Sequence, residues 1–340
     1  MKARSIQNFA AGLALALGQP AMAQSRLVVN CFWPAKHIAC TEILPHWLNE
    51  VTRVTEGRVK GNIPPTSVAP PPEQLGSVEK GVVDVAVQFN GLIQNRVTGP
   101  MVAMNPFSGN DNAGAMSQAL WETNRKFFPD ELKGAVLLSQ FVISPGELFS
   151  QSATPVNSMA DLKARKVWAL PGPLADITKG LGAGVVSTPA VQSGEIISRG
   201  VVDAHIGLDP QAVRNLQLGD YTKSMTQFSR SLYTTSFSLV INKDRWAKIS
   251  AADQAAILKV SGATFAAMAG GAWAKDNAAA LQTLQAKGLK VVKADPAFEA
   301  ELIKASAGIT AGWVQKATAA GIDGKAALAF YQSRLTELSK

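Results

Sequence analysis

Two stretches of this chain follow one pattern: Val78-Glu79-Lys80-Gly81-Val82-Val83-Asp84-Val85-Ala86-Val87 and Ile197-Ser198-Arg199-Gly200-Val201-Val202-Asp203-Ala204-His205-Ile206. Both place Gly-Val-Val-Asp between a helical segment and an apolar run, so each predicts a helix that ends at a left-handed glycine and leads into a buried strand. Four shared residues can also arise by coincidence in a chain rich in Ala, Val and Gly, but the agreement extends to both flanks. The pair therefore predicts two α/β domains whose equivalent corners face a cleft, because ligands bind beyond the carboxyl ends of parallel strands.

The composition predicts a globular protein of about two domains. The chain has 340 residues, of which 47% are hydrophobic and 17% charged, so it has enough apolar material for more than one core. Its net charge of +8 comes from Lys and Arg spread singly along the chain, without the basic clusters and interleaved aromatic residues of a nucleic-acid face. The sequence therefore predicts no nucleic-acid partner.

Residues 1–23 have the pattern of a secretory signal peptide. Lys2 and Arg4 precede an apolar run over 9–17, and Ala21-Met22-Ala23 supplies the small-x-small pattern that signal peptidase recognises. The run is much shorter than the roughly 20 apolar residues that span a bilayer, although an N-terminal anchor is the alternative. We expect cleavage after Ala23 and a periplasmic mature protein.

The two cysteines are Cys31 and Cys40, and in an oxidising compartment such a pair is expected to form one disulfide. Two buried free thiols are the alternative. The two cysteines do not form a CxxC motif. The three histidines, His37, His46 and His205, are not spaced like the ligands of a metal site. We therefore expect no metal site.

Apolar periodicity and turn residues predict the remaining elements. The expected strands cover 26–30, 57–60, 136–142, 166–170, 235–242 and 289–292. The expected helices cover 43–54, 72–80, 112–127, 158–163, 251–287 with a bend at Gly270-Gly271, and 296–338.

The sequence contains no recognisable catalytic motif. The GxSxG, HExxH, P-loop and GxGxxG patterns are absent, and no nucleophile–base pair can be named. We interpret His205 as a packed or solvent-bridging residue, and Asp84 and Asp203 as side chains that fix their turns by hydrogen bonds from backbone N–H groups. The sequence thus predicts a protein with no catalytic residue and no cofactor, and a secreted α/β hydrolase or lyase is the less favoured alternative.

In this order, the elements resemble the periplasmic solute-binding subunits of TRAP transporters, the DctP-like family, over nearly all of the mature chain. The segments that carry the resemblance are Trp33-Pro34, Gly57-Arg58-Val59-Lys60, 75–87, 158–167, Gly200-Val201-Val202-Asp203 and 232–243. The resemblance implies a two-domain α/β periplasmic binding protein fold with hinge strands, a long connecting helix and a ligand cleft. Domain I would comprise 24–145 plus 234–273, and domain II would comprise 146–233 plus 274–340.

The same resemblance implies a function. Family members capture a small organic solute by domain closure and deliver it to the small and large subunits of a membrane permease. We expect this chain to act in that way as a monomer. A periplasmic sensor module built on the same fold is an alternative.

The chain departs from the family pattern at the carboxylate anchor. Family members read Asp-Leu-Lys-Gly-x-Lys-x-Arg, and that arginine binds the ligand carboxylate through two parallel hydrogen bonds. Here the corresponding position is Trp168, whose indole has one donor and no charge. We therefore expect a neutral, zwitterionic or cationic ligand rather than a simple organic acid.

Aromatic and polar residues approach the cleft in such a fold. The aromatic residues favour an apolar or neutral pocket, and a cage for an ammonium group, completed by Glu147, is the second interpretation. Amide and hydroxyl groups would orient the ligand, and Asp209 is a second acidic candidate. The expected ligand-binding residues are Trp33, Gln88, Asn90, Glu147, Phe149, Trp168, Gly207, Asp209, Ser236 and Phe237.

Overall fold

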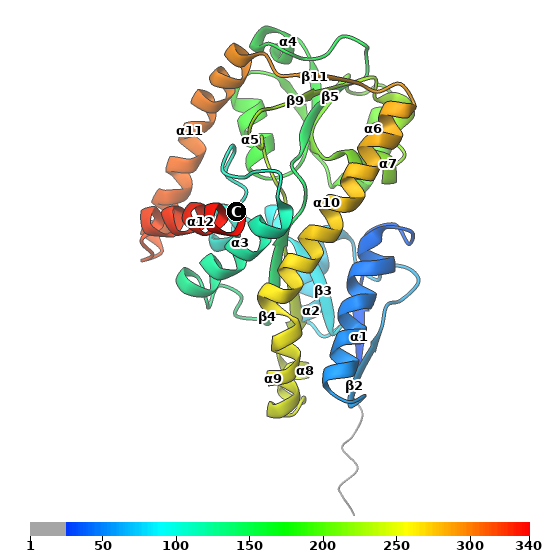
Figure 1. Ribbon diagram of the computed structural model, residues 1–340, viewed down its shortest axis with the longest axis vertical. Coiled ribbons are helices and arrows are strands. Elements are labelled where there is room, and N and C mark those ends of the chain that lie inside the picture. Colours follow the sequence, from blue (N-terminus) through cyan, green and yellow to red (C-terminus); the bar gives the residue numbers. More distant parts are fainter. Residues whose placement is uncertain (1–24) are drawn as a thin grey trace, which may run out of the picture.

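The computed structural model describes residues 25–340, so the expected signal peptide lies outside the described residues. Figure 1 shows two α/β parts arranged along the long axis of the molecule, with the helix α10 running from one to the other. Each part is built on its own sheet. This is the two-domain α/β fold that the sequence predicts.

The first sheet has five strands in the order β2-β1-β3-β10-β4. β10 runs antiparallel to both of its neighbours, and Phe237 pairs with Phe89 on one side and with Phe141 on the other. Every residue of β10 is buried, which explains its uninterrupted apolar and small-polar sequence. The strands are β1 (Ser25–Asn30), β2 (Val59–Asn62), β3 (Val85–Phe89), β4 (Ala135–Val142) and β10 (Ser236–Asn242).

The second sheet has six strands in the order β11-β9-β5-β8-β6-β7. β5 is antiparallel to β8 and β9, while β6 is parallel to β7 and β8. The strands are β5 (Glu147–Ser150), β6 (Lys166–Ala169), β7 (Gly184–Val186), β8 (Ala204–Leu208), β9 (Ser224–Gln227) and β11 (Lys290–Lys293).

The duplicated Gly-Val-Val-Asp corners have the same geometry in the two sheets. Gly81 and Gly200 are both left-handed, with φ of 69° and 65°, directly after α2 (Gln74–Glu79) and α6 (Ser193–Ser198). Asp84 accepts a hydrogen bond from the backbone N–H of Val28 at 2.7 Å, and Asp203 accepts one from Lys166 at 3.1 Å. Each aspartate therefore ties its corner to the neighbouring strand.

Helices cover the faces and ends of both sheets. The longer ones are α1 (Leu44–Val54), α3 (Ala113–Phe127), α9 (Ala251–Val260), α10 (Gly262–Ala286), α11 (Pro296–Ala319) and α12 (Gly324–Leu338). The shorter α-helices are α4 (Met159–Lys163), α5 (Pro173–Gly180), α7 (Pro210–Asn215) and α8 (Lys243–Ala247). Single turns of other helical types are η1 (Ala39–Ile43), η2 (Pro71–Glu73), η3 (Asn90–Ile93), η4 (Gly99–Val102), η5 (Ala190–Gln192) and η6 (Gly219–Tyr221).

Two helix predictions are wrong in detail. The helix expected over 251–287 breaks at Ser261, whose ψ is −144°, rather than bending at Gly270-Gly271. Gly270 serves close helix packing instead, because a Cβ there would lie 2.4 Å from the carbonyl oxygen of Ala113 in α3. The expected C-terminal helix is also two helices, because Gly321 at φ 81° ends α11 and Asp323 caps α12.

The apolar stretch Ala251–Ala286 is long enough to cross a membrane by length and composition alone. In this fold α10 packs on α3 and β4 of the first part and on α7 of the second. The helix α10 of this stretch therefore connects the two parts of the fold (Figure 1). We call the boundary between the two parts, each with its own sheet, the seam.

Candidate ligand-binding pocket

A narrow pocket of about 70 Å³ lies at the seam between the two sheets. Phe89 and Phe237 reach it from the first sheet, and Gly207 and Leu208 from the second. The full lining is Phe32, Trp33, His37, Pro71, Phe89, Leu92, Ile143, Leu170, Pro189, Ala190, Val191, Gly207, Leu208, Asp209, Gln211, Ala212, Asn215, Leu216, Thr235, Phe237 and Trp273. A molecule in this pocket would touch both halves of the fold at once.

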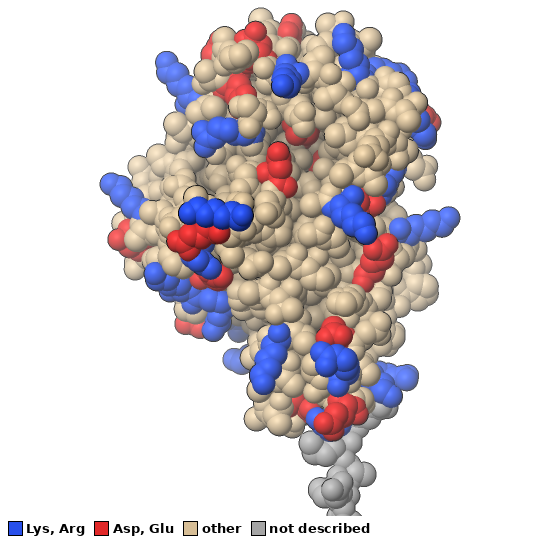
Figure 2. Space-filling view, viewed as in Figure 1, with Lys and Arg blue, Asp and Glu red and all other residues tan. Residues whose placement is uncertain are grey.

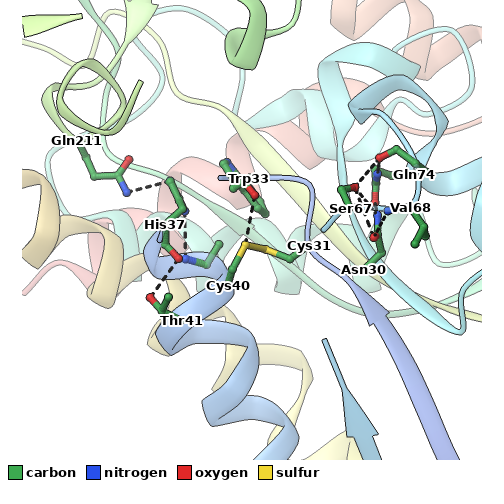
Figure 3. Close-up of a disulfide and its surroundings, with 12 residues drawn as sticks. Asn30, Cys31, Trp33, His37, Cys40, Thr41, Ser67, Val68, Gln74 and Gln211 are labelled. Atoms are coloured by element: carbon green, nitrogen blue, oxygen red, sulfur yellow. Dashed lines mark hydrogen bonds between the residues drawn. A yellow bond between two sulfur atoms is a disulfide. The ribbon is translucent and has the colours of Figure 1, made fainter. Parts of the chain in front are cut away.

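A disulfide fixes one wall of the pocket. Cys31 and Cys40 are bonded, with their Cα atoms 5.7 Å apart, as the sequence predicts. The loop that they close follows β1 and contributes Phe32, Trp33 and His37 to the pocket lining. Figure 3 shows Trp33 and His37 beside the disulfide. A covalent tie across nine positions restricts the conformations of these three side chains.

Aromatic rings form the body of the pocket. Trp33 stacks on Phe32 at 3.9 Å between ring centroids and contacts Phe237 at 5.3 Å. Trp273 of α10 meets Trp33 edge-on at 5.7 Å and stacks with Phe237 at 6.3 Å. These distances are those of favourable aromatic pairs, so the rings form one continuous surface drawn from three separate segments.

Asp209 is the acidic group of the pocket. It directly follows β8 and caps α7, with Oδ1 accepting from the N–H of Ala212 and Oδ2 accepting from Nε1–H of Trp273, both at 2.8 Å. The side chain is fully buried, and this burial raises the pKa of Asp209 to about 7. At neutral pH the carboxyl group is therefore divided between its protonated and ionised forms.

His37 is held from three sides. Its ring stacks on Trp33 at 5.3 Å and contacts Trp273 at 5.0 Å, while Nδ1 accepts from the N–H of Ala39 at 3.1 Å. Nε2 lies 3.0 Å from the side-chain amide of Gln211 in α7, which approaches from the other side of the seam (Figure 3). Burial lowers the pKa of His37 to about 4, so the imidazole is neutral at physiological pH.

The pocket has little electrostatic attraction for an anion. Among the described residues that line it there is no Lys or Arg. Arg214 lies in α7 near the pocket, but its guanidinium is paired with Asp276 at 2.7 Å. Figure 2 shows Lys and Arg scattered over the visible face, many beside Asp or Glu.

Four of the expected ligand-binding residues line the pocket: Trp33, Gly207, Asp209 and Phe237. The other six lie outside this lining. Gln88 accepts from the N–H of Leu75 and donates to the carbonyl of Phe89, so it braces the end of β3.

Asn90 and Ser236 belong to a buried hydrogen-bonded chain inside the first sheet. Gln140 donates to Ser238, which donates to Asn90; Asn90 donates in turn to Ser236, which donates to the carbonyl of Pro100. This chain supports the strand ends behind the aromatic surface.

Trp168 lies inside the second sheet. It is fully buried in β6, and its Nε1–H donates to Oγ1 of Thr188 at 3.0 Å. On the neighbouring strand it pairs with His205, which stacks on Phe149 of β5 at 4.7 Å. Burial lowers the pKa of His205 to about 3, so this whole row is uncharged.

Glu147 begins β5, and burial raises the pKa of its carboxyl group well above the usual range. It does not line the pocket, and one of its carboxylate oxygens is buried without a partner among the described residues. Among residues 25–340 no cluster of His, Cys, Asp and Glu has the arrangement of a metal site.

Sequence reasoning missed several lining residues, chiefly His37, Gln211 and Trp273. Trp273 is a large aromatic residue within the long Ala-rich helix, where only a bend was considered. The pair Asp209-Pro210 could have indicated Gln211, because Asp before Pro is typical of a helix start. A helix that starts there has Gln211 in its first turn, next to the end of β8.

The chain matches known proteins over most of its length. Residues 29–316 match the profile of the family described as bacterial extracellular solute-binding protein, family 7. The outer membrane transporter protein TsaT of Comamonas testosteroni is 36% identical over 332 residues, covering 95% of this chain and 96% of the relative.

Solved structures agree with this match. A TRAP periplasmic solute-binding protein of Bordetella bronchiseptica with bound (R)- and (S)-mandelate has a TM-score of 0.87 and 32% identity, covering 92% of this chain and 99% of that chain. A marine metagenome TRAP solute-binding protein specific for aromatic acid ligands, in complex with metahydroxyphenylacetate, has a TM-score of 0.86 and 25% identity, covering 93% and 100%. The chain therefore belongs to bacterial extracellular solute-binding protein family 7, the family of TRAP periplasmic solute-binding proteins.

Proposed function

We propose that this chain is the extracytoplasmic solute-binding subunit of a TRAP-type transporter and that it binds a small aromatic solute with an uncharged polar group. The observation that carries this proposal is the composition of the pocket: aromatic rings form its surface, and its described lining contains no Lys or Arg. An aromatic ring would stack on Trp33, Phe237 and Trp273 with both faces removed from water.

The absence of a cation from the described lining argues against a plain carboxylate. A buried anion without a positive partner or several donors loses more hydration than it regains. Ionised Asp209 would repel the anion further. A neutral head group avoids both costs.

Two similar proteins support the aromatic part of the proposal. The Bordetella bronchiseptica protein holds mandelate, and the marine metagenome protein is specific for aromatic acid ligands. Both ligands contain the ring that we propose here. The proposed departure concerns the head group: the sequence pattern predicts Trp168 at the family's arginine position, and the described pocket lining has no Lys or Arg.

Ligand contacts with both domains would favour domain closure. In the proposed division, 24–145 plus 234–273 and 146–233 plus 274–340 form the two domains, and the pocket draws residues from both. A ligand that touches both domains favours the closed state, because it makes more contacts there. We propose that the mature protein begins after Ala23, acts as a monomer and delivers the solute to the small and large permease subunits.

The test compares two probes with the same ring, (R)-mandelamide and (R)-mandelate, by calorimetry on the mature chain at pH 8. We expect mandelamide to bind at least about tenfold more tightly, because Asp209 is ionised at this pH. Trp33→Ala should abolish binding, whereas Trp246→Ala, which removes a tryptophan outside the pocket lining, should not. Mandelate binding as tightly as mandelamide would refute the neutral head group, and no binding of either probe would refute the aromatic class.

A further inference from the structure

The side-chain amide of Gln211 faces a histidine whose tautomer is fixed by the backbone. Nδ1 of His37 accepts a hydrogen bond from the N–H of Ala39, so Nδ1 carries no proton. A neutral imidazole bears one proton, which must then lie on Nε2. Nε2 of His37 is therefore a donor, and it lies 3.0 Å from the Gln211 amide.

Only one end of the Gln211 amide suits that donor. With its nitrogen toward His37, two donors would face each other, and the amide oxygen would be buried with no partner among the described residues. With its oxygen toward His37, the amide accepts from Nε2–H, and the NH₂ group occupies the other position. The two orientations fill the same space, so the hydrogen bonds decide between them.

We propose that Gln211 directs its amide N–H into the pocket and donates it to an acceptor oxygen of the solute, with His37 as the positioning residue that fixes this orientation. This inference rests on the proposed function, because it names the chemistry of the ligand's head group. The favoured class is an aromatic solute with a carbonyl oxygen. Such an oxygen would satisfy a donor that is otherwise buried without a partner.

The geometry also couples this donor to closure. His37 lies in the disulfide loop after β1 of the first sheet, and Gln211 lies in α7 after β8 of the second. The backbone N–H of Gln211 is held separately by Asn277 of α10 at 2.9 Å. The amide is thus oriented only when the two sides of the seam meet, so recognition of the carbonyl belongs to the closed state.

The first experiment reads the tautomer of His37 directly. Long-range ¹H–¹⁵N correlation spectra of the unliganded mature protein at pH 7 should show His37 protonated on Nε2 and not on Nδ1. The same spectra of Gln211→Leu should show a changed Nε2 environment. A His37 protonated on Nδ1, or on both nitrogens at pH 7, would overturn the proposal without involving any ligand.

The second experiment isolates the carbonyl group with two uncharged probes of matched shape, acetophenone and ethylbenzene. We expect the wild-type preference for acetophenone over ethylbenzene to fall at least about tenfold in Gln211→Glu, which places an acceptor where the donor was. Gln285→Glu is the matched control: it makes the same change at an exposed glutamine of α10 outside the pocket lining, and it should leave the preference within about threefold.

The outcomes separate the two proposals. An unchanged preference in Gln211→Glu would overturn the role of Gln211, even if both probes bind. If the wild-type protein binds neither probe, the aromatic class in the proposed function fails, and the His37 tautomer alone decides the orientation of Gln211.

Discussion

Asp209→Asn should remove the pH dependence that the buried carboxyl group imposes on folding. In the folded protein burial raises the pKa of Asp209 from 3.8 to about 7. The folded state therefore keeps a proton that the unfolded chain loses, and the resulting stability is complete below pH 3.8. It is lost as the pH rises through 7.

The size of this effect follows from the two pKa values. A pKa raised from 3.8 to about 7 makes the ionised group cost the folded state about 4 kcal/mol at high pH. Between pH 5 and pH 8 the free energy of unfolding of the wild type should fall by about 2–3 kcal/mol relative to Asp209→Asn. The variant has its own cost of about 1–2 kcal/mol, because one amide oxygen cannot accept from both Ala212 and Trp273. The wild type already carries about 2 kcal/mol of the ionisation cost at pH 5, so the two proteins should be about equally stable there, and the variant should be more stable at pH 8.

Nearby charges change the size of this difference but not its sign. The charge of Asp276 in α10 raises the pKa of Asp209, and the charge of Asp209 in turn raises the pKa of Glu147 at the start of β5. Removing the charge of Asp209 also relieves Glu147, which adds to the gain of the variant at high pH. Arg214 is already paired with Asp276 and does not offset these acids.

Urea unfolding followed by circular dichroism from pH 5 to 8 measures the effect. Asp209→Ser is the matched control, because a serine hydroxyl can cap α7 without ionising. Both variants should lose the fall in stability with pH that the wild type shows. Parallel curves for all three proteins would refute the reasoning, because they would mean that Asp209 is ionised at pH 5 despite its burial.

Two further predictions concern the walls of the pocket. Replacing Cys31 and Cys40 by serine should lower the free energy of unfolding by about 2–3 kcal/mol and weaken ligand binding, because the loop that carries Trp33 is no longer tied; thermal unfolding and calorimetry measure both. Gly207→Ala should lower stability by more than about 2 kcal/mol, since its φ is 96° and a Cβ would lie 2.3 Å from Leu174. Gly180→Ala, where a Cβ meets no atom within 4 Å, should be close to neutral, and an equal loss in both variants would contradict this explanation.

The fold could be predicted from the sequence because the patterns that indicate its helices and strands depend on neighbouring residues. The two Gly-Val-Val-Asp corners combine a left-handed glycine with an apolar strand, and both features depend on neighbouring residues only. The disulfide followed from an exported chain with two cysteines. The break at Ser261 has a local signal in the pair Ser261-Gly262, because Gly262 is left-handed with φ of 49°. Packing also holds the break, since Ser139 donates to the carbonyl of Gly262.

The pocket was readable only in part. Trp33, Asp209 and Gly207 lie at or just beyond the ends of their strands, and Phe237 lies near the start of its own, where a cleft is expected. Trp168 could not be assigned to a face in the same way, because a strand buried on both sides shows no alternation of polar and apolar residues. The meeting of His37 and Gln211 depends on how the two sheets close, and no local pattern encodes it.

We propose that Trp168 occupies the family's arginine position, and the surroundings of Trp168 are consistent with this. Trp168 lies beside a His205 whose lowered pKa keeps it neutral, and the row continues into Phe149. A guanidinium in that row would be buried without a counter-charge, which costs several kcal/mol. In the pocket itself, burial lowers the pKa of His37 and raises the pKa of Asp209, and both shifts favour the uncharged form of the side chain. Both places disfavour charge, so charged solutes would be excluded first. Selection among the remaining uncharged solutes would then depend on the placement of single hydrogen-bond donors, such as the amide of Gln211.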